Sequence, residues 1–259
     1  MSPEKIPEHD ILCAGFPCQP FSQAGFKRGL EDTRGTLFFN IIRIMQVKKP
    51  RTFFLENVRH PKQHEGGETF ETMKGALGES GYTFFWYSLC AHIVSAKDHE
   101  LPPVRPRLFI SGFREGESFT PPPKRKLTLT MSDILGGQCS REIGYTLRVG
   151  GASSGITGRH NRDSYRVDGQ VRKLTVGQAA QMQGFPKDFR FPVPDRIAMK
   201  QPGNSVAVPA VRDYAERIIQ TLRAELPVSD REAMKRSGSS AAVPVIRDYR
   251  RFVLQALLL

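Results

Sequence analysis

The stretch that decides the fold is His9-Asp10-Ile11-Leu12-Cys13-Ala14-Gly15-Phe16-Pro17-Cys18. Its apolar first part predicts a strand, and the glycine and proline that follow predict a loop. Cys18 therefore stands on a Pro-bounded loop directly after a strand. A cysteine in this place is either a small buried hydrophobe or a presented nucleophile, and this stretch alone does not separate the two.

Further apolar runs with β-branched or aromatic residues predict more strands. They are 52–55, 82–90 and 108–113, and helical patterns lie between some of them at 36–46 and 69–77. Strands that alternate with helices predict a parallel α/β sheet, whose chemistry lies beyond the carboxyl ends of the strands. Cys18 follows the first strand and Glu56 follows the second, so we expect both at that edge of the sheet.

The second half of the chain has a different composition. Gly, Ser, Thr and Arg dominate residues 121–168, which predicts a small, loop-rich, basic region. A helix at 175–183, a loop at 201–205 and a last helix at 208–222 are predicted to follow.

The tail repeats an earlier segment. Residues 233–244 echo 198–209, with Ser239 where the first copy has Asn204, so we interpret the tail as a local duplication. The predicted division is a catalytic α/β domain at 1–120, a small second region at 121–170, a return segment at 171–224 that completes the first domain, and a degenerate repeat tail at 225–259.

The chain carries a large positive charge. Its 259 residues include 38 Lys and Arg against 26 Asp and Glu, a formal net charge of +12, which favours a polyanionic partner such as nucleic acid. The four cysteines have no metal-ligand spacing, so we predict neither a metal site nor a disulfide framework. No stretch reaches the roughly 18 apolar residues that span a bilayer. We expect a soluble, intracellular protein without a membrane partner.

Five short motifs occur in a definite order along the chain. They are Gly15–Gln19, Leu55–Val58, Arg105–Arg107, Arg172–Thr175 with Gln183–Pro186, and Gly203–Val206. In this order they resemble the DNA (cytosine-5)-methyltransferases of bacterial restriction-modification systems, over most of residues 9–222. The resemblance implies a partial Rossmann-like, class I methyltransferase sheet with a small target-recognition region. It also implies methyl transfer from S-adenosylmethionine to carbon 5 of cytosine in duplex DNA, in the bacterial cytoplasm at the nucleoid.

The resemblance assigns catalytic roles that suit the residue types. Carbon 5 of cytosine is a poor nucleophile until a group adds at carbon 6, and Cys18 matches the thiolate that does so. Glu56 matches the carboxyl that binds ring nitrogen 3 and the 4-amino group of the flipped base. Arg107 matches the arginine that holds the base carbonyl, with Arg105 beside it. The alternatives are a helix-start carboxylate for Glu56 and a solvated charged turn for the arginines.

Ligand contacts follow from the same resemblance. The positions that match the S-adenosylmethionine pocket are Pro17, Leu37, Asn204 and Ser205, with Phe185 nearby. Leu37 taken alone is better explained as a core helix position. Residues 22–34 resemble a mobile loop that closes over the flipped base. The DNA-binding candidates are Gln19, Ser22, Gln23, Arg34, Arg148 and Arg159, and for the arginines a phosphate contact is favoured over base reading.

The chain departs from the family pattern at its front. About ten residues precede the strand before Cys18, which leaves no room for two βαβ units of roughly 30 residues each, and no Gly-rich cofactor loop follows a strand. We therefore expect the N-terminal strands to be missing, and the exposed strand edge either to lower solubility or to bind a complementary chain. The alternative to an enzyme is a non-catalytic DNA-binding remnant, and a tRNA-methylating relative is a weaker third interpretation.

Overall fold

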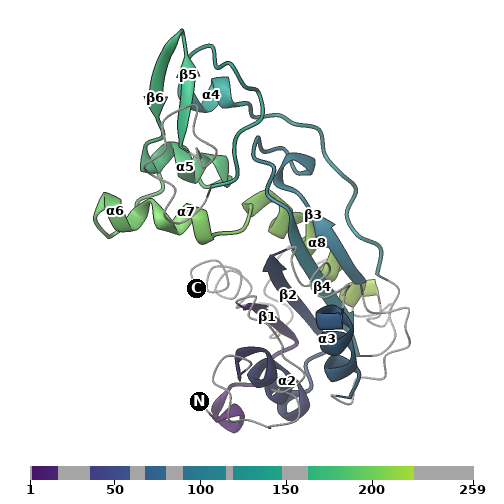
Figure 1. Ribbon diagram of the computed structural model, residues 1–259. Coiled ribbons are helices and arrows are strands. Elements are labelled where there is room, and N and C mark those ends of the chain that lie inside the picture. Colours follow the sequence, from purple (N-terminus) through teal and green to yellow (C-terminus); the bar gives the residue numbers. More distant parts are fainter. Residues whose placement is uncertain are drawn as a thin grey trace, which may run out of the picture.

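The computed structural model describes residues 2–16, 36–58, 68–79, 90–114, 119–147 and 163–224. Figure 1 shows two lobes, one built around a four-stranded sheet and one around a two-stranded hairpin. The extended segment 119–130 leads from the sheet lobe to the second lobe, and the last described helix returns to the sheet. Residues that meet between the lobes therefore come from distant parts of the sequence.

The sheet of the first lobe is mixed. Its strands are β1 (Ile11–Gly15), β2 (Thr52–Val58), β3 (Cys90–Val94) and β4 (Arg107–Phe113), in the order β1-β2-β4-β3. β1 and β2 are parallel, but β4 is antiparallel to both β2 and β3. The expectation of a parallel sheet is therefore wrong beyond β2. The physical reason is that β3 and β4 are joined through the 3-10 turn η5 (Ala96–Asp98), and parallel pairing needs a crossover helix.

Most predicted elements of this lobe are confirmed, with one shift. The predicted helices at 36–46 and 69–77 correspond to α2 (Thr36–Lys48) and α3 (Glu68–Glu79). The predicted strand at 82–90 overlaps β3 only at Cys90, and residues 80–89 lie outside the described ranges.

Helices cover both faces of the sheet. The other elements of this lobe are α8 (Val208–Ala224) and the short turn η1 (Pro3–Lys5), which lies against α2. Phe53 and Leu55 are fully buried on the face that α2 and α3 cover. Phe54 points to the opposite face, where its ring centroid lies 6.0 Å from that of Tyr214 in α8. Because successive side chains of a strand alternate, the continuous apolar run of β2 supplies both cores.

The second lobe has its own core. Its elements are α4 (Met131–Leu135), β5 (Ser164–Val167), β6 (Gln170–Lys173), α5 (Val176–Met182), α6 (Asp195–Ala198) and α7 (Lys200–Asn204). Met131, Tyr165 and Met182 are fully buried at its centre. A Cβ at Gly144 would lie 2.6 Å from the Met131 sulfur and 2.8 Å from Met182 Cε, so a side chain at that position would displace the core. α5 thus packs in this lobe rather than against the sheet.

The predicted loop at 201–205 is mostly helical, which corrects the expectation. α7 extends to Asn204, and the Ser205 N–H donates to the Gln201 carbonyl at 2.8 Å. Pro202 lies in the first turn of α7, where its missing N–H costs no intrahelical hydrogen bond, so it does not interrupt the helix.

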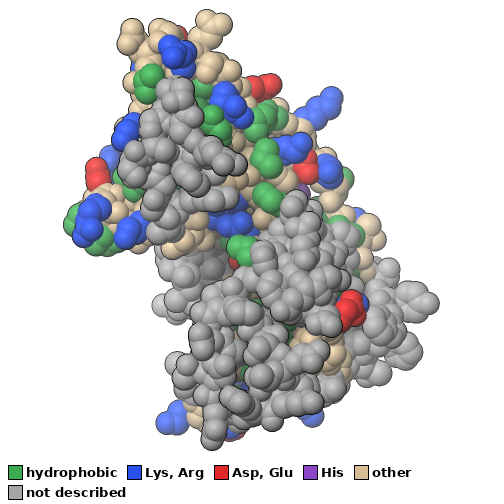
Figure 2. Space-filling view, in the orientation of Figure 1, with side chains coloured by type: hydrophobic (Ala, Val, Ile, Leu, Met, Phe, Trp, Pro, Cys, Tyr) green, Lys and Arg blue, Asp and Glu red, His purple; other side chains and the backbone are tan. Residues whose placement is uncertain are grey.

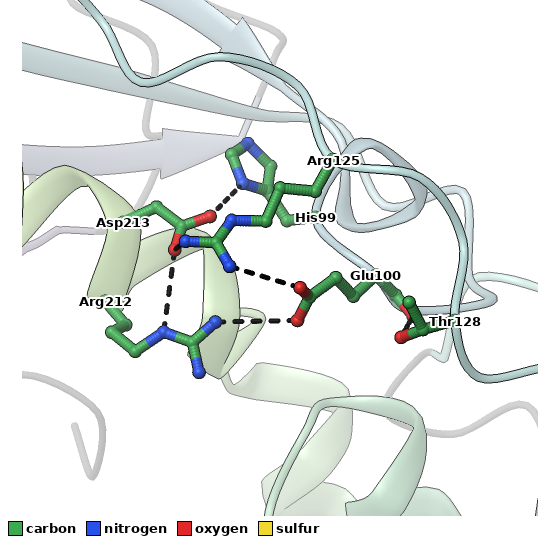
Figure 3. A network of polar contacts seen from close by, with 6 residues as sticks. All are labelled: His99, Glu100, Arg125, Thr128, Arg212 and Asp213. Carbon is green, nitrogen blue, oxygen red and sulfur yellow. Dashed lines mark hydrogen bonds and ion pairs between the residues drawn. The ribbon is translucent and has the colours of Figure 1, made fainter.

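A network of charged side chains fastens α8 to the segment between the lobes (Figure 3). The carboxylate of the buried Asp213 lies 2.8 Å from His99 Nδ1 and 3.0 Å from Arg125 Nη2. Glu100 binds Arg125 at 3.2 Å and Arg212 at 3.5 Å. These side chains come from three separate segments. The network therefore fixes α8, the turn after η5 and the connecting segment 119–130 together.

Candidate active site

Glu56 stands where the apolar run of β2 ends. The register of the sheet places it beside Gly15, the last residue of β1, and the Phe16 N–H donates to the Glu56 carbonyl at 3.4 Å. A Cβ at Gly15 would lie 3.5 Å from Glu56 Oε2. The carboxylate therefore lies against the end of β1, at the edge where the sequence places the chemistry.

Arg107 approaches the same carboxylate from the other side. It begins β4, which flanks β2 opposite to β1. Its Nε lies 2.9 Å from Glu56 Oε1, and the side chains of Arg107 and Glu56 are 16% and 19% exposed. Glu56 is thus held between Gly15 and Arg107 on two neighbouring strands.

Burial sets the charge balance of this pair. Removal from water raises the pKa of the Glu56 carboxyl, and the charges of Arg107 and Arg105 oppose that rise. Burial also lowers the pKa of Arg107, and Glu56 opposes this, yet a guanidinium stays charged at neutral pH. A raised pKa favours the protonated carboxyl at a higher pH than in an ordinary glutamate, and in that form it can donate a hydrogen bond.

Arg105 has partners of another kind. It is 2% exposed, and its guanidinium donates to the backbone carbonyls of Ser205, Leu147 and Gly203. Burial, followed by the neighbouring Arg107 charge, lowers the pKa of Arg105 to about 9, so the group is still protonated at neutral pH. The structure therefore places Arg105 on backbone carbonyls and Arg107 on the carboxylate.

The cofactor candidates that the structure describes differ in exposure. Asn204 is exposed at the end of α7, whereas Ser205 is buried and its hydroxyl donates to the Pro202 carbonyl at 3.0 Å. Phe185 is half-buried and packs on Phe189, with ring centroids 4.8 Å apart.

Several candidates lie outside the described residues. They are Cys18, Pro17, Gln19, Ser22, Gln23, Arg34, Arg148 and Arg159. Leu37 is described by its backbone alone, in the first turn of α2. The assignments of these residues stay predictions.

Exposed basic side chains gather on the second lobe, as Figure 2 shows for the visible face. In the described part of this lobe and the segment leading to it they are Lys124, Arg125, Lys126, Arg141, Arg166, Arg172, Lys173, Lys187, Arg190, Arg196 and Lys200. A surface of this charge attracts anionic ligands.

Sequence reasoning missed the partners of two buried polar residues. Nothing local marks His99 and Asp213, which lie 114 positions apart, as neighbours. An acidic residue on the buried face of the amphipathic α8 is the signal that could have found Asp213. The role of Gly15 was also missed, although a glycine at a strand end is where close approach of a side chain is expected.

Two further observations concern the described residues. Within the ranges that the structure describes, no group of three or more His, Cys, Asp or Glu side chains could hold a metal ion. No helix in those ranges is long and apolar enough to cross a bilayer.

The chain is similar in sequence and fold to known methyltransferases. The sequence model of the family described as C-5 cytosine-specific DNA methylase matches residues 1–149 and 139–220. The Type II methyltransferase M.SsoII of Shigella sonnei is 40% identical over 255 residues, which cover 84% of this chain and 65% of that protein. M.NlaX of Neisseria lactamica is 37% identical over 251 residues, 85% of this chain and 79% of that protein.

A solved structure shares the fold. The Entamoeba histolytica methyltransferase EhMeth superposes with a TM-score of 0.62 over 82% of this chain and 78% of that chain, at 15% identity. The chain spans less than two thirds of the length of M.SsoII.

Proposed function

The chain belongs to the C-5 cytosine-specific DNA methylase family, and we propose that it transfers a methyl group from S-adenosylmethionine to carbon 5 of cytosine in duplex DNA. The observation that carries this proposal is the Glu56–Arg107 pair at the end of β1. The segment with Cys18 continues from that strand end. Covalent geometry keeps the Cα of Cys18 within about 11 Å of the Cα of Gly15, the residue beside Glu56.

The residues have separate roles in the proposed reaction. The Cys18 thiolate adds to carbon 6 of a flipped cytosine, which makes carbon 5 nucleophilic toward the methyl group. Loss of the carbon 5 proton to a base and departure of the Cys18 thiolate from carbon 6 then restore the ring double bond and free the enzyme. The Glu56 carboxyl hydrogen-bonds ring nitrogen 3 and the 4-amino group, and it offsets the negative charge that builds on the ring. Arg107 fixes the orientation of that carboxyl from β4 and binds the base carbonyl with its remaining donors.

Asn204 and Ser205, with Phe185 nearby, are the described residues proposed to hold the cofactor. S-Adenosylmethionine supplies an electrophilic methyl group on a sulfonium, and it carries carboxylate, amino and hydroxyl groups. The exposed amide of Asn204 is the kind of donor and acceptor that such groups require. Buried Ser205, with its hydroxyl on the Pro202 carbonyl, fixes the backbone that presents that amide.

We further propose that a complementary chain pairs with the outer edge of β1. In the described sheet β1 is the terminal strand, and its side chains are only partly buried although Leu12 and Ala14 pack on one core and Ile11 and Cys13 on the other. A parallel strand with apolar side chains on both faces is normally an interior strand. The outer edge of β1 is therefore suited to pair with a strand of another chain.

The proposed partner and place of action follow from the reaction. Residues 22–34 would close over the flipped base, and Gln19, Ser22, Gln23 and Arg34 would line the duplex. Arg148, Arg159 and the basic surface of the second lobe would bind phosphates. A protein with this substrate acts in the bacterial cytoplasm, at the nucleoid.

Transfer of a labelled methyl group tests the proposal. The chain is incubated with tritiated S-adenosylmethionine and cytosine-containing duplex DNA, with and without the product of the upstream reading frame. Label in the DNA supports an enzyme, and label only in the second mixture supports the complementary chain. Label in neither mixture overturns the proposal, and retained DNA binding would then favour the non-catalytic remnant. Competition by duplex DNA against tRNA identifies the substrate.

A pair of variants connects the label to the site. Glu56→Gln should lower methyl transfer by about 10²- to 10⁴-fold, the range for loss of a positioned acid or base. Glu71→Gln removes an exposed carboxylate whose ion pair with Lys74 lies on the surface, and it should leave the rate unchanged.

A further inference from the structure

The Arg105 guanidinium joins three backbone segments. Nη1 donates to the Leu147 carbonyl at 2.8 Å, Nη2 to the Gly203 carbonyl at 2.5 Å, and Nε to the Ser205 carbonyl at 3.1 Å. Each nitrogen of the guanidinium thus has its own carbonyl partner. At 2% exposure the side chain has little water to replace these partners.

These segments belong to different parts of the molecule. Leu147 lies in the core of the second lobe, at the end of its first described segment. Gly203 and Ser205 lie at the end of α7, directly before the chain returns to the sheet as α8. Arg105 itself lies two residues before β4. One side chain therefore ties the residues before β4 to the second lobe at Leu147 and to the returning segment at Gly203 and Ser205.

Neighbouring contacts continue the same junction. The Gly144 N–H donates to the Pro102 carbonyl at 3.2 Å, and the Thr146 hydroxyl donates to the Val104 carbonyl. Residues 144–147 thus run along residues 102–105, and Arg105 closes this contact on the side of Gly203 and Ser205.

We propose that Arg105 is a positioning residue, not a catalytic one, and that it couples the second lobe and the segment 203–205 to β4, the strand that begins with Arg107. The inference rests on the proposed function. Pro106, with its fixed φ, separates the two arginines, so a displacement of the carbonyls bound by Arg105 is passed to the arginine that orients Glu56.

The arrangement requires arginine specifically. A guanidinium presents its donors in a rigid planar fork, so it can hold three carbonyls in different directions. A lysine keeps the charge but is a compact point donor on a flexible stem, and it cannot span all three. Arg105→Lys therefore removes the junction with little change in charge or volume.

Hydrogen exchange of backbone amides tests the junction without the reaction. In the full chain, Arg105→Lys should speed exchange about tenfold or more at 144–147 and 203–205, because local opening there no longer breaks the Arg105 contacts. Amides of β2 should keep their protection. The matched control is Arg166→Lys, an exposed arginine that donates to one carbonyl, that of Gly169 at 3.1 Å, and it should change neither segment.

Kinetics provide the second readout. If the chain transfers methyl groups, Arg105→Lys should raise KM for DNA and for S-adenosylmethionine together, and it should lower kcat by less than Arg107→Lys does. Arg107→Lys should act mainly on kcat, since Arg107 holds the carboxyl that acts on the ring. A KM for either ligand that stays at the wild-type value would contradict the coupling.

The two proposals fail separately. Suppose that the wild type transfers methyl groups and that Arg105→Lys leaves exchange at both segments unchanged. This result overturns the Arg105 junction and leaves the proposed reaction supported. Faster exchange in a chain that transfers no methyl group overturns the reaction and leaves the junction. If Arg105→Lys does not fold, hydrogen exchange of the wild type is measured in low denaturant. Segments 144–147 and 203–205 should then open with the same free energy, because one side chain holds both. Different opening free energies would contradict the junction.

Discussion

Arg107 Nε lies 2.9 Å from Glu56 Oε1, so the first residue of β4 holds a carboxylate near the end of β2. The Arg107 charge opposes the rise in the Glu56 pKa that burial causes. Arg107→Gln removes this charge, so the pKa of Glu56 should rise further. A ¹³C NMR titration of the glutamate carboxyls measures it, with Arg166→Gln as the control. An unchanged or lower Glu56 pKa would contradict the ion pair.

The same pKa sets a direction for stability. The folded-state pKa of Glu56 lies above its ordinary value of 4.5, so the carboxyl favours the folded state at low pH, and this contribution is lost as the pH rises through the folded pKa. Glu56→Gln removes this titrating group. The free energy of unfolding of the wild type, minus that of the variant, should therefore fall as the pH rises above 4.5. Urea unfolding at a series of pH values measures it. A difference that grows with pH would contradict the raised pKa.

Two glycines around α5 should respond to alanine in opposite ways. Gly184 has φ +82°, and a Cβ there would lie 2.6 Å from Pro209 Cδ, so Gly184→Ala should destabilise by at least about 1–2 kcal/mol. Gly177 lies within α5 and a Cβ would meet nothing within 4 Å, so Gly177→Ala should stabilise by roughly 0.5–1 kcal/mol. Midpoints of urea unfolding give both values. Equal effects of the two changes would contradict the positive φ of Gly184 and its close approach to Pro209.

The network in Figure 3 should be worth more than a surface ion pair. Asp213→Ala leaves the buried His99 without its partner, so it should lower the free energy of unfolding by about 1–3 kcal/mol. Lys124→Met breaks an ion pair with Asp98 in which the lysine is 80% exposed, and it should cost less than about 1 kcal/mol. Chemical denaturation compares them, and a smaller loss for Asp213→Ala than for Lys124→Met would refute the ranking.

Cys13 is half-buried in β1, and its apolar surroundings should still make it unreactive in the folded chain. Burial raises its pKa to about 11, so only about one thiol in a thousand is a thiolate at pH 8. Iodoacetamide at pH 8 should leave the Cys13 peptide unlabelled in native protein and label it in urea. Labelling of the native chain at the rate seen in urea would contradict its burial.

The sequence predicts the part of the site that depends on strand order. The apolar runs before Gly15 and before Glu56 identify adjacent parallel strands, and their carboxyl ends meet as expected. The antiparallel insertion of β4 beside β2 was not predictable, because strand pairing depends on tertiary contacts that local periodicity does not encode. The partners of Arg105 were not predictable either, since backbone carbonyls carry no residue identity.

The motif order, by contrast, predicts which distant side chains lie together. It singles out Glu56 and Arg107, 51 positions apart, and the structure brings them into contact. It places Arg105 beside Arg107 among the catalytic candidates, and only the fold shows that the two arginines have different partners.

The most direct measurement of the central claim is a covalent trap. Duplex DNA with 5-fluorocytosine is incubated with the chain and S-adenosylmethionine, with and without the product of the upstream reading frame, and the adduct is digested and sequenced by mass spectrometry. An adduct should form on Cys18. Cys18→Ser should abolish it, Cys13→Ser should preserve it, and Glu56→Gln should weaken it. An adduct on Cys13, or one that survives Cys18→Ser, would show that Cys18 is not the nucleophile.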